Sequence, residues 1–118
     1  MSTPLYDKGI ALRRKVLGEK HIAKREASPD PFTKQQNELV TELAWGTLWS
    51  RPGLPLKTRS LVTLAMLTAL DLPDELRGHI LGALNSGATQ EEIYEVFVQA
   101  AGYCGFPASN GADRKSVV

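Results

Sequence analysis

Apolar residues recur at helical spacing along almost the whole chain, and no segment alternates as a half-buried strand does. A first helix is predicted over residues 5–17, ended by Gly18, and an irregular polar stretch then leads to the breaker SPDP at residues 28–31. Asp30 is placed to cap the next helix, and Pro31 suits its first position. The pattern predicts an all-α protein.

The middle of the chain contains a turn and a very apolar helix. The segment RPGL at residues 51–54 has proline and glycine where a type II turn needs them. Residues 55–70 are apolar nearly all round, which predicts a helix buried on most sides. Asp71 and Pro73 then separate this helix from the one that carries His79.

Capping residues delimit the last helices. Gly87 is the expected left-handed cap of the helix that carries His79. Thr89 and Glu92 form a capping box for a helix that runs to about Cys104. Gly105 ends that helix, and a short last helix is predicted to follow from Pro107.

Length and composition favour a single small domain. The chain has 118 residues, 42% of them hydrophobic, and a net charge of +1. We expect one domain over residues 1–118 with about five to six helices: an N-terminal helix and irregular arm at 1–30, and a helical core at 31–110. A core of this size is modest, so association into an oligomer would add burial. The basic residues of the amino-terminal third alternate with acidic ones, so we interpret them as a solvated face and expect no nucleic-acid partner.

Cysteine usage and the ends of the chain bear on the compartment. The single cysteine, Cys104, excludes an intrachain disulfide and a cysteine-rich zinc site, and we interpret it as a buried, inert thiol. The first residues, MSTPLYDKG, lack a signal-peptide pattern, and the most apolar run, SLVTLAMLTAL, is too short to span a membrane. We therefore expect a soluble, cytoplasmic protein with no membrane partner.

His79 is the first candidate for chemistry. It shares a helical stripe with Leu76, Ile80 and Ala83. The pattern alone favours a core histidine whose ring nitrogens bond to neighbouring carbonyl groups or to Glu75, one turn earlier. The functional alternative is a general acid or base, because histidine titrates near neutral pH.

Two arginines and two tryptophans are further candidates. Arg51 and Arg59 flank the RPGL turn, and either could be a surface arginine that bonds a helix end. Arg59, however, begins a nearly uncharged helix, where a guanidinium is costly without an anion such as a carboxylate. Trp45 and Trp49 lie four residues apart and would line a subunit interface or a pocket. His21 is expected at the surface. Without a phosphate loop, nucleophile elbow or metal-ligand spacing, we expect no metal and no organic cofactor.

Four sequence blocks together carry a family resemblance. They are YDKGIALRRKVLGEKHI, AWGTLWSRPGL, TRSLVTLAMLTAL and DELRGHILGALNSGATQEEIYEVFVQAAGYCGFPASN. In this order they resemble the carboxymuconolactone decarboxylase family over about residues 6–110. The resemblance implies an all-helical domain that assembles as a homohexamer or homotrimer. It also implies the cofactor-independent decarboxylation of a dicarboxylate lactone, 4-carboxymuconolactone, to β-ketoadipate enol-lactone in protocatechuate catabolism.

The resemblance and the chemistry of that reaction together imply roles for particular residues. His79 would be the proton donor or the oxyanion donor. Arg51 and Arg59 would bind the two carboxylates, and Trp45 would form a wall of the pocket. Two further candidates for substrate binding are Glu42 and Tyr103.

Two comparisons within the family narrow the interpretation. Some members are thiol peroxidases with a CxxC pair before the matching histidine, but those positions here hold Leu72 and Glu75, which excludes that chemistry. The C-terminal SNGADRKSVV departs from the amphipathic helix of the family, and Asp113 stands where an apolar residue is expected, which would weaken subunit contacts. The alternatives left open are a non-catalytic helical oligomer that binds small carboxylates and a relative that acts on another small lactone or keto acid.

Overall fold

The computed structural model describes residues 2–115, with side chains up to Asp113, and it confirms the all-α prediction. This part of the chain contains helices and no strand, and it has more helices than the five to six expected. Residues 116–118 of the divergent tail lie outside the described residues. The helices are α1 (Pro4–Leu17), α2 (Glu19–Glu26), α3 (Pro31–Leu39), η1 (Val40–Leu48), α4 (Leu56–Leu70), α5 (Pro73–Asn85), α6 (Gln90–Cys104) and α7 (Phe106–Lys115).

The helices group into two compact units that meet in the chain at Leu54 and Pro55. The first unit contains α1, α2, α3 and η1, and the second contains α4 to α7. The boundary predicted near residue 30 falls inside the first unit. None of the helices in the described part of the chain is long and apolar enough to cross a membrane.

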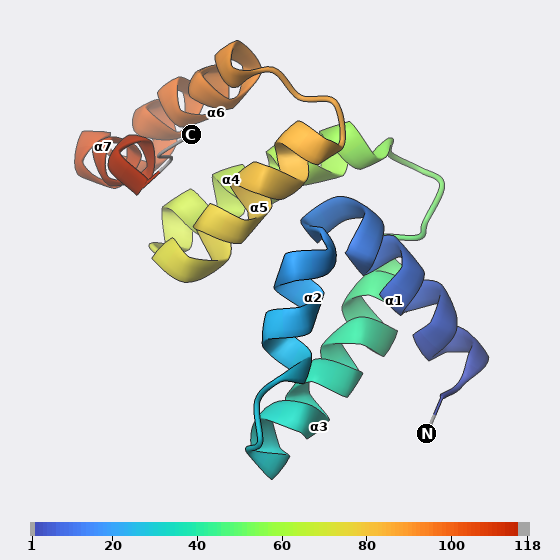
Figure 1. The fold of residues 1–118 in the computed structure, drawn as a ribbon. Helices are drawn as coiled ribbons and strands as arrows, with labels where there is room; N and C mark the ends of the chain where they lie inside the picture. Colours follow the sequence, from blue (N-terminus) through green and yellow to red (C-terminus); the bar gives the residue numbers. More distant parts are fainter. Residues whose placement is uncertain (1, 116–118) are drawn as a thin grey trace. The chain divides into compact units, whose positions relative to one another are not determined.

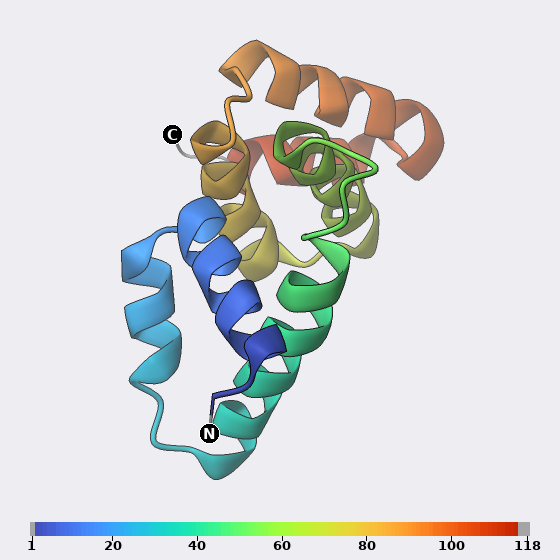
Figure 2. The ribbon, with the colours of Figure 1, turned by 90° about the vertical axis from the view of Figure 1, so that its right-hand side faces the viewer.

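In the first unit, α1 packs along η1, as both ribbon views show (Figures 1 and 2). The buried apolar side chains of this unit are Val16, Leu17, Ile22 and Trp45. The predicted first helix, its end at Gly18, and the Asp30 cap of α3 are all confirmed. The irregular stretch expected after Gly18 is wrong, because α2 forms there. Only Ile22 of α2 is buried, so eight residues offered no apolar periodicity to detect.

The helix that follows α3 is a π-helix, which the sequence pattern did not predict. The Trp49 N–H donates to the carbonyl oxygen of Ala44, five residues earlier, at 2.8 Å. The Thr47 hydroxyl likewise reaches the carbonyl oxygen of Glu42, also five residues earlier, at 3.2 Å. Over η1 the 3.6-residue spacing assumed from the sequence is therefore wrong, and the wider π-helical turn decides which side chains share a face.

The second unit has a core formed by all four of its helices, α4 to α7. The residues of this core are Leu64, Leu76, Ile80, Ala83, Ala88, Ile93, Phe97 and Ala112. Only Ser60, Leu64 and Thr68 of α4 are buried, along one stripe. Met66 and Leu70 are exposed, so the prediction that this helix is buried on most sides is wrong for the single chain.

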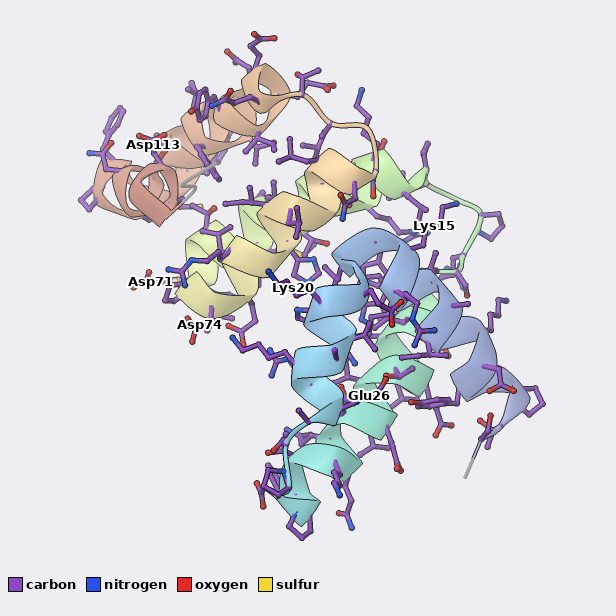
Figure 3. All side chains as sticks on the ribbon, in the orientation of Figure 1. Lys15, Lys20, Glu26, Asp71, Asp74 and Asp113 are labelled. Carbon is purple, nitrogen blue, oxygen red and sulfur yellow. The ribbon has the colours of Figure 1, made fainter. Side chains whose placement is uncertain are left out.

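Most of the predicted ends of helices in the second unit are confirmed. Gly87 takes the left-handed φ of 98°, and the Ala88 N–H closes the α5 C-terminus on the Ala83 carbonyl at 2.9 Å. The Thr89 and Glu92 capping box is complete. The type II turn predicted before α4 is wrong, because Gly53 is not among the described glycines with positive φ. Figure 3 shows the side chains of Asp71 and Asp74 at the connection between α4 and α5.

Candidate active-site residues

Two of the predicted substrate-binding residues lie on η1 in the first unit. Trp45 is only 3% exposed, and its ring stacks on that of Trp49, with centroids 4.5 Å apart and planes inclined by 16°. Glu42 lies in the first turn of η1 and is partly exposed. The π-helical turn of η1 therefore sets where the Glu42 carboxylate and the indole pair lie relative to each other.

Arg51 also belongs to the first unit, in the segment that follows η1. Its side chain is exposed, and its backbone N–H donates to the Leu48 carbonyl oxygen at 3.2 Å. Because its side chain is exposed, the Arg51 guanidinium carries little cost of desolvation, and its role in carboxylate binding stays a prediction.

The second unit carries Arg59 and His79 on two helices that pack against each other, α4 and α5. Arg59 lies in the first turns of α4, where its N–H bonds to the Pro55 carbonyl at 3.0 Å and its own carbonyl accepts from the Thr63 hydroxyl at 2.7 Å. Its side chain is half-buried, with the Nε atom fully buried. The aliphatic stem and Nε of Arg59 are thus partly covered by the unit, as is common for a long cationic side chain on an apolar helix.

His79 is half-buried on α5, and its Nδ1 atom is fully buried. Its neighbours on the predicted stripe, Leu76, Ile80 and Ala83, are all buried in the core, which confirms that stripe. Glu75, one turn earlier, is exposed. His79 therefore lies at the edge of the core, with one ring nitrogen buried and part of the residue exposed.

Tyr103 and Cys104 lie together at the end of α6. Tyr103 is 87% exposed, so nothing in the second unit encloses its phenol. Cys104 is also exposed, and the prediction of a buried thiol is wrong. Both side chains follow the last buried residues of α6, Ala100 and Ala101, and lie beyond the core.

Sequence reasoning missed the burial of Arg13 and the partial burial of His21, both in the first unit. Arg13 is 5% exposed, and burial, followed by the nearby charge of Arg25, lowers its pKa. Burial, followed by the positive charges of Arg13, Arg25 and Lys24, lowers the pKa of His21 to about 4. The Nε2 atom of His21 is fully buried. The prediction of a solvated basic face is therefore wrong for Arg13, while His21 is half-buried, with one ring nitrogen inside the unit.

A signal for the burial of Arg13 was present in the sequence. Gly9, Arg13, Val16 and Leu17 are the buried residues of α1, and their spacing of four, three and one is that of a single helical face. An arginine on that face interrupts an otherwise apolar stripe, and its charge alone led to its assignment to the surface.

Among the described residues, no three histidine, cysteine, aspartate or glutamate side chains gather in a way that could hold a metal ion.

The described residues form an all-helical protein in which His79 and Arg59 are half-buried and Arg51 is exposed. The model of the carboxymuconolactone decarboxylase family matches residues 37–114. The chain belongs to the carboxymuconolactone decarboxylase family.

Similar proteins include two decarboxylases. The chain is 44% identical to the 4-carboxymuconolactone decarboxylase of Acinetobacter baylyi over 91% of its own length and 80% of that relative. It is 45% identical to the nitrosuccinic acid decarboxylase of Metarhizium robertsii over 88% of its length and 73% of that relative. It is also 39% identical to an uncharacterised 15.0 kDa protein of Paracoccus denitrificans over 62% of its length and 56% of that relative.

Proposed function

We propose that this protein is a carboxy-lyase that converts 4-carboxymuconolactone to β-ketoadipate enol-lactone, a step in the catabolism of the aromatic compound protocatechuate. The observation that carries the proposal is the 44% identity to a 4-carboxymuconolactone decarboxylase over nearly the whole chain. The family model matches residues 37–114, a range that includes the helices that bear Glu42, Trp45, Arg59 and His79.

The chemistry of this substrate explains what the protein must supply. The carboxylate that leaves is attached to a ring carbon that is conjugated, through the ring double bond, to the lactone carbonyl. When carbon dioxide departs, the electron pair of the broken carbon–carbon bond moves into the ring as a dienolate. A proton then adds to the carbon next to the carbonyl and gives the enol-lactone. The substrate is its own electron sink, so the protein needs to hold two carboxylates, stabilise an oxyanion and deliver one proton.

The candidate residues match these needs one by one. His79 donates the proton, or a hydrogen bond to the oxyanion, because its imidazole is fixed against the core yet partly exposed. Arg51 and Arg59 bind carboxylates through their forked guanidinium groups. Trp45 provides an apolar wall, while Glu42 and Tyr103 are additional contacts. In this mechanism the reaction requires neither a metal nor an organic cofactor.

The direct test is to incubate the purified protein with 4-carboxymuconolactone and to follow the loss of substrate in the ultraviolet together with the release of carbon dioxide. We expect equimolar carbon dioxide and enol-lactone. Binding of the substrate without turnover would favour the alternative of a non-catalytic carboxylate-binding oligomer.

A second candidate substrate is suggested by the similarity to a nitrosuccinic acid decarboxylase. Nitrosuccinate also has two carboxylates and an internal electron sink, because the electrons left by carbon dioxide can spread onto the nitro group. Comparing kcat/KM for the two substrates in the same assay would decide between them, and the proposal for the lactone requires the lactone to be preferred.

We further propose that the chain acts as a homohexamer or homotrimer in the cytoplasm. Large apolar side chains that are exposed on the single chain support the assembly, because such groups are commonly covered by a partner. They include Phe32, Leu43, Met66, Leu70, Val98 and Phe106. The exposed thiol of Cys104 suits a reducing compartment. Light scattering of the purified protein would give the number of subunits, and cell fractionation would test the compartment.

A further inference from the structure

Arg13 makes a small hydrogen-bonded network at the point where α3 becomes η1. Its Nη1 atom donates to Oδ1 of Asn37 at 2.6 Å and to Oγ1 of Thr41 at 3.0 Å. The Thr41 hydroxyl in turn donates to the carbonyl oxygen of Asn37 at 2.8 Å. Asn37 lies in the last turn of α3 and Thr41 in the first turn of η1. The guanidinium of α1 therefore binds both sides of the change from α-helical to π-helical turns.

The burial of this guanidinium is costly. Arg13 is almost completely buried, and both of its hydrogen bonds go to neutral oxygen atoms. A cation in such a place loses hydration that neutral acceptors replace only in part, and an apolar side chain of similar size would often be more stable. Packing of the core alone therefore does not explain an arginine here, whereas its two fixed hydrogen bonds can specify one register of the helix.

The backbone of α1 touches the same part of η1. A Cβ atom on Gly9 would collide with the carbonyl oxygen of Thr41 and would lie 2.8 Å from the amide nitrogen of Gly46, five residues further on. The α1 helix therefore fits η1 at two points, through the backbone at Gly9 and through the side chain at Arg13, and both points involve Thr41.

The register of η1 determines the position of the candidate substrate-binding residues that follow Thr41. Glu42 is the next residue, and Trp45 follows three residues later. A shift of one residue in a helix turns every following side chain by about 100° around the axis. In the observed register, Trp45 is buried and stacked on Trp49. A return of this segment to α-helical turns would alter both the indole stack and the direction of the Glu42 carboxylate.

We propose that Arg13 is a positioning residue that holds the π-helical register of η1 through Asn37 and Thr41, and thereby orients Glu42 and Trp45 for the substrate. The part concerning Glu42 and Trp45 rests on the proposed function, whereas the part concerning the register of η1 does not.

The experiment uses the two tryptophans as reporters, because the chain contains no others. The full-length protein is labelled with 5-fluorotryptophan, and its two fluorine resonances are assigned with the Trp49→Phe variant. Thr41→Val removes the hydroxyl at nearly constant volume, while Thr41→Ser keeps it. Arg13→Met removes the donor of both hydrogen bonds, to Asn37 and to Thr41. It replaces Thr41→Val as the test if Thr41→Val does not fold. Each variant is examined by fluorine NMR and by decarboxylase kinetics.

We expect Thr41→Val and Arg13→Met to shift or split both resonances and to lower kcat/KM about 10- to 100-fold, as small misplacements of substrate contacts do. Thr41→Ser should retain the resonances and the activity. Thr3→Ala is the matched control for a loss of stability alone. It removes the side-chain cap of α1, a 3.0 Å bond from the Tyr6 N–H to the Thr3 hydroxyl oxygen, and neither residue of this bond belongs to η1. This control should keep both resonances and kcat/KM.

Unchanged resonances in folded Thr41→Val and Arg13→Met would overturn the assignment of the register to Arg13. Shifted resonances with unchanged kcat/KM would overturn its positioning role. If the unsubstituted protein does not turn over the lactone, the proposed function fails, and the fluorine spectra still decide whether Arg13 sets the register.

Discussion

Gly9 of α1 lies so close to the carbonyl oxygen of Thr41 in η1 that a Cβ atom at position 9 would overlap with it. Gly46 makes the reciprocal approach, because a Cβ atom there would lie 2.6 Å from the carbonyl oxygen of Leu5. Both obstructing atoms belong to the backbones of helices and cannot rotate away as the end of a flexible side chain can. The first unit is thus built on contact between two helix backbones.

Gly9→Ala is therefore expected to destabilise the protein strongly. The added methyl group must push α1 away from η1, and overpacking of this kind costs about 1–3 kcal/mol or more. Urea unfolding at a fixed protein concentration would show a lower midpoint. The matched control is Gly102→Ala on α6, where a Cβ atom meets nothing within 4 Å. There the higher helix propensity of alanine should stabilise the protein by about 0.5–1 kcal/mol. Equal effects of the two substitutions would contradict the close approach at Gly9.

The ends of the helices could be predicted from the sequence because local residues determine them. Asp30, Gly87 and the Thr89 and Glu92 pair act within four residues of the backbone groups that they satisfy. The π-helical turns of η1 could not be predicted in this way. They coincide with contacts from α1, at Gly9 and Arg13, that lie more than twenty residues away in the sequence.

At the candidate site too, features set by local spacing could be predicted from the sequence, and features set by packing of distant segments could not. The stripe of His79 followed from helical spacing, and its buried neighbours are confirmed. The burial of Arg13 and the partial burial of His21 were missed because composition assigns charged residues to the surface. The exposure of Cys104 was missed because the apolar run of α6 gave no indication of where its buried face ends.

Replacement of His79 by alanine is predicted to lower kcat for 4-carboxymuconolactone by about 10²- to 10⁴-fold, the usual contribution of a general acid. The helical circular dichroism and the oligomer size should not change, since His79 is only half-buried. Glu75→Gln, one turn earlier on the same helix and exposed, is the matched control and should keep its activity. Near-normal turnover by the alanine variant would refute the role of His79.

Arg59→Lys should raise KM for the lactone far more than it lowers kcat. Lysine keeps the positive charge but cannot form the forked pair of hydrogen bonds with a carboxylate, so the ground state and the transition state lose the same contact. Steady-state kinetics measure both constants. Arg77→Lys, an exposed arginine on α5, is the control and should leave both constants unchanged. An unchanged KM in the Arg59 variant would show that this guanidinium does not bind the substrate.

His21 predicts a specific dependence of stability on pH. Its pKa is about 4 in the folded protein and 6.5 as the reference value, so between these limits the unfolded chain binds a proton that the folded chain does not. The free energy of unfolding should therefore fall as the pH is lowered from 6.5 towards 4. Above pH 6.5, His21 should contribute nothing to the pH dependence of that free energy. Because the ring is partly exposed, we expect a loss on the order of 1–2 kcal/mol.

Measurements of stability between pH 7 and 5 separate the contribution of His21 from those of the carboxyl groups. The carboxyl pKa values of Asp30 and Glu92 are lowered by their hydrogen bonds to Thr33 and Lys57, so these groups lose their stabilising charge only at lower pH. His21→Gln should flatten the decline measured by urea unfolding, while His79→Gln tests the other histidine. An Arg13→Met variant should raise the pKa of His21, because one neighbouring positive charge is removed. A decline of the same slope with and without His21 would show that burial does not depress its pKa.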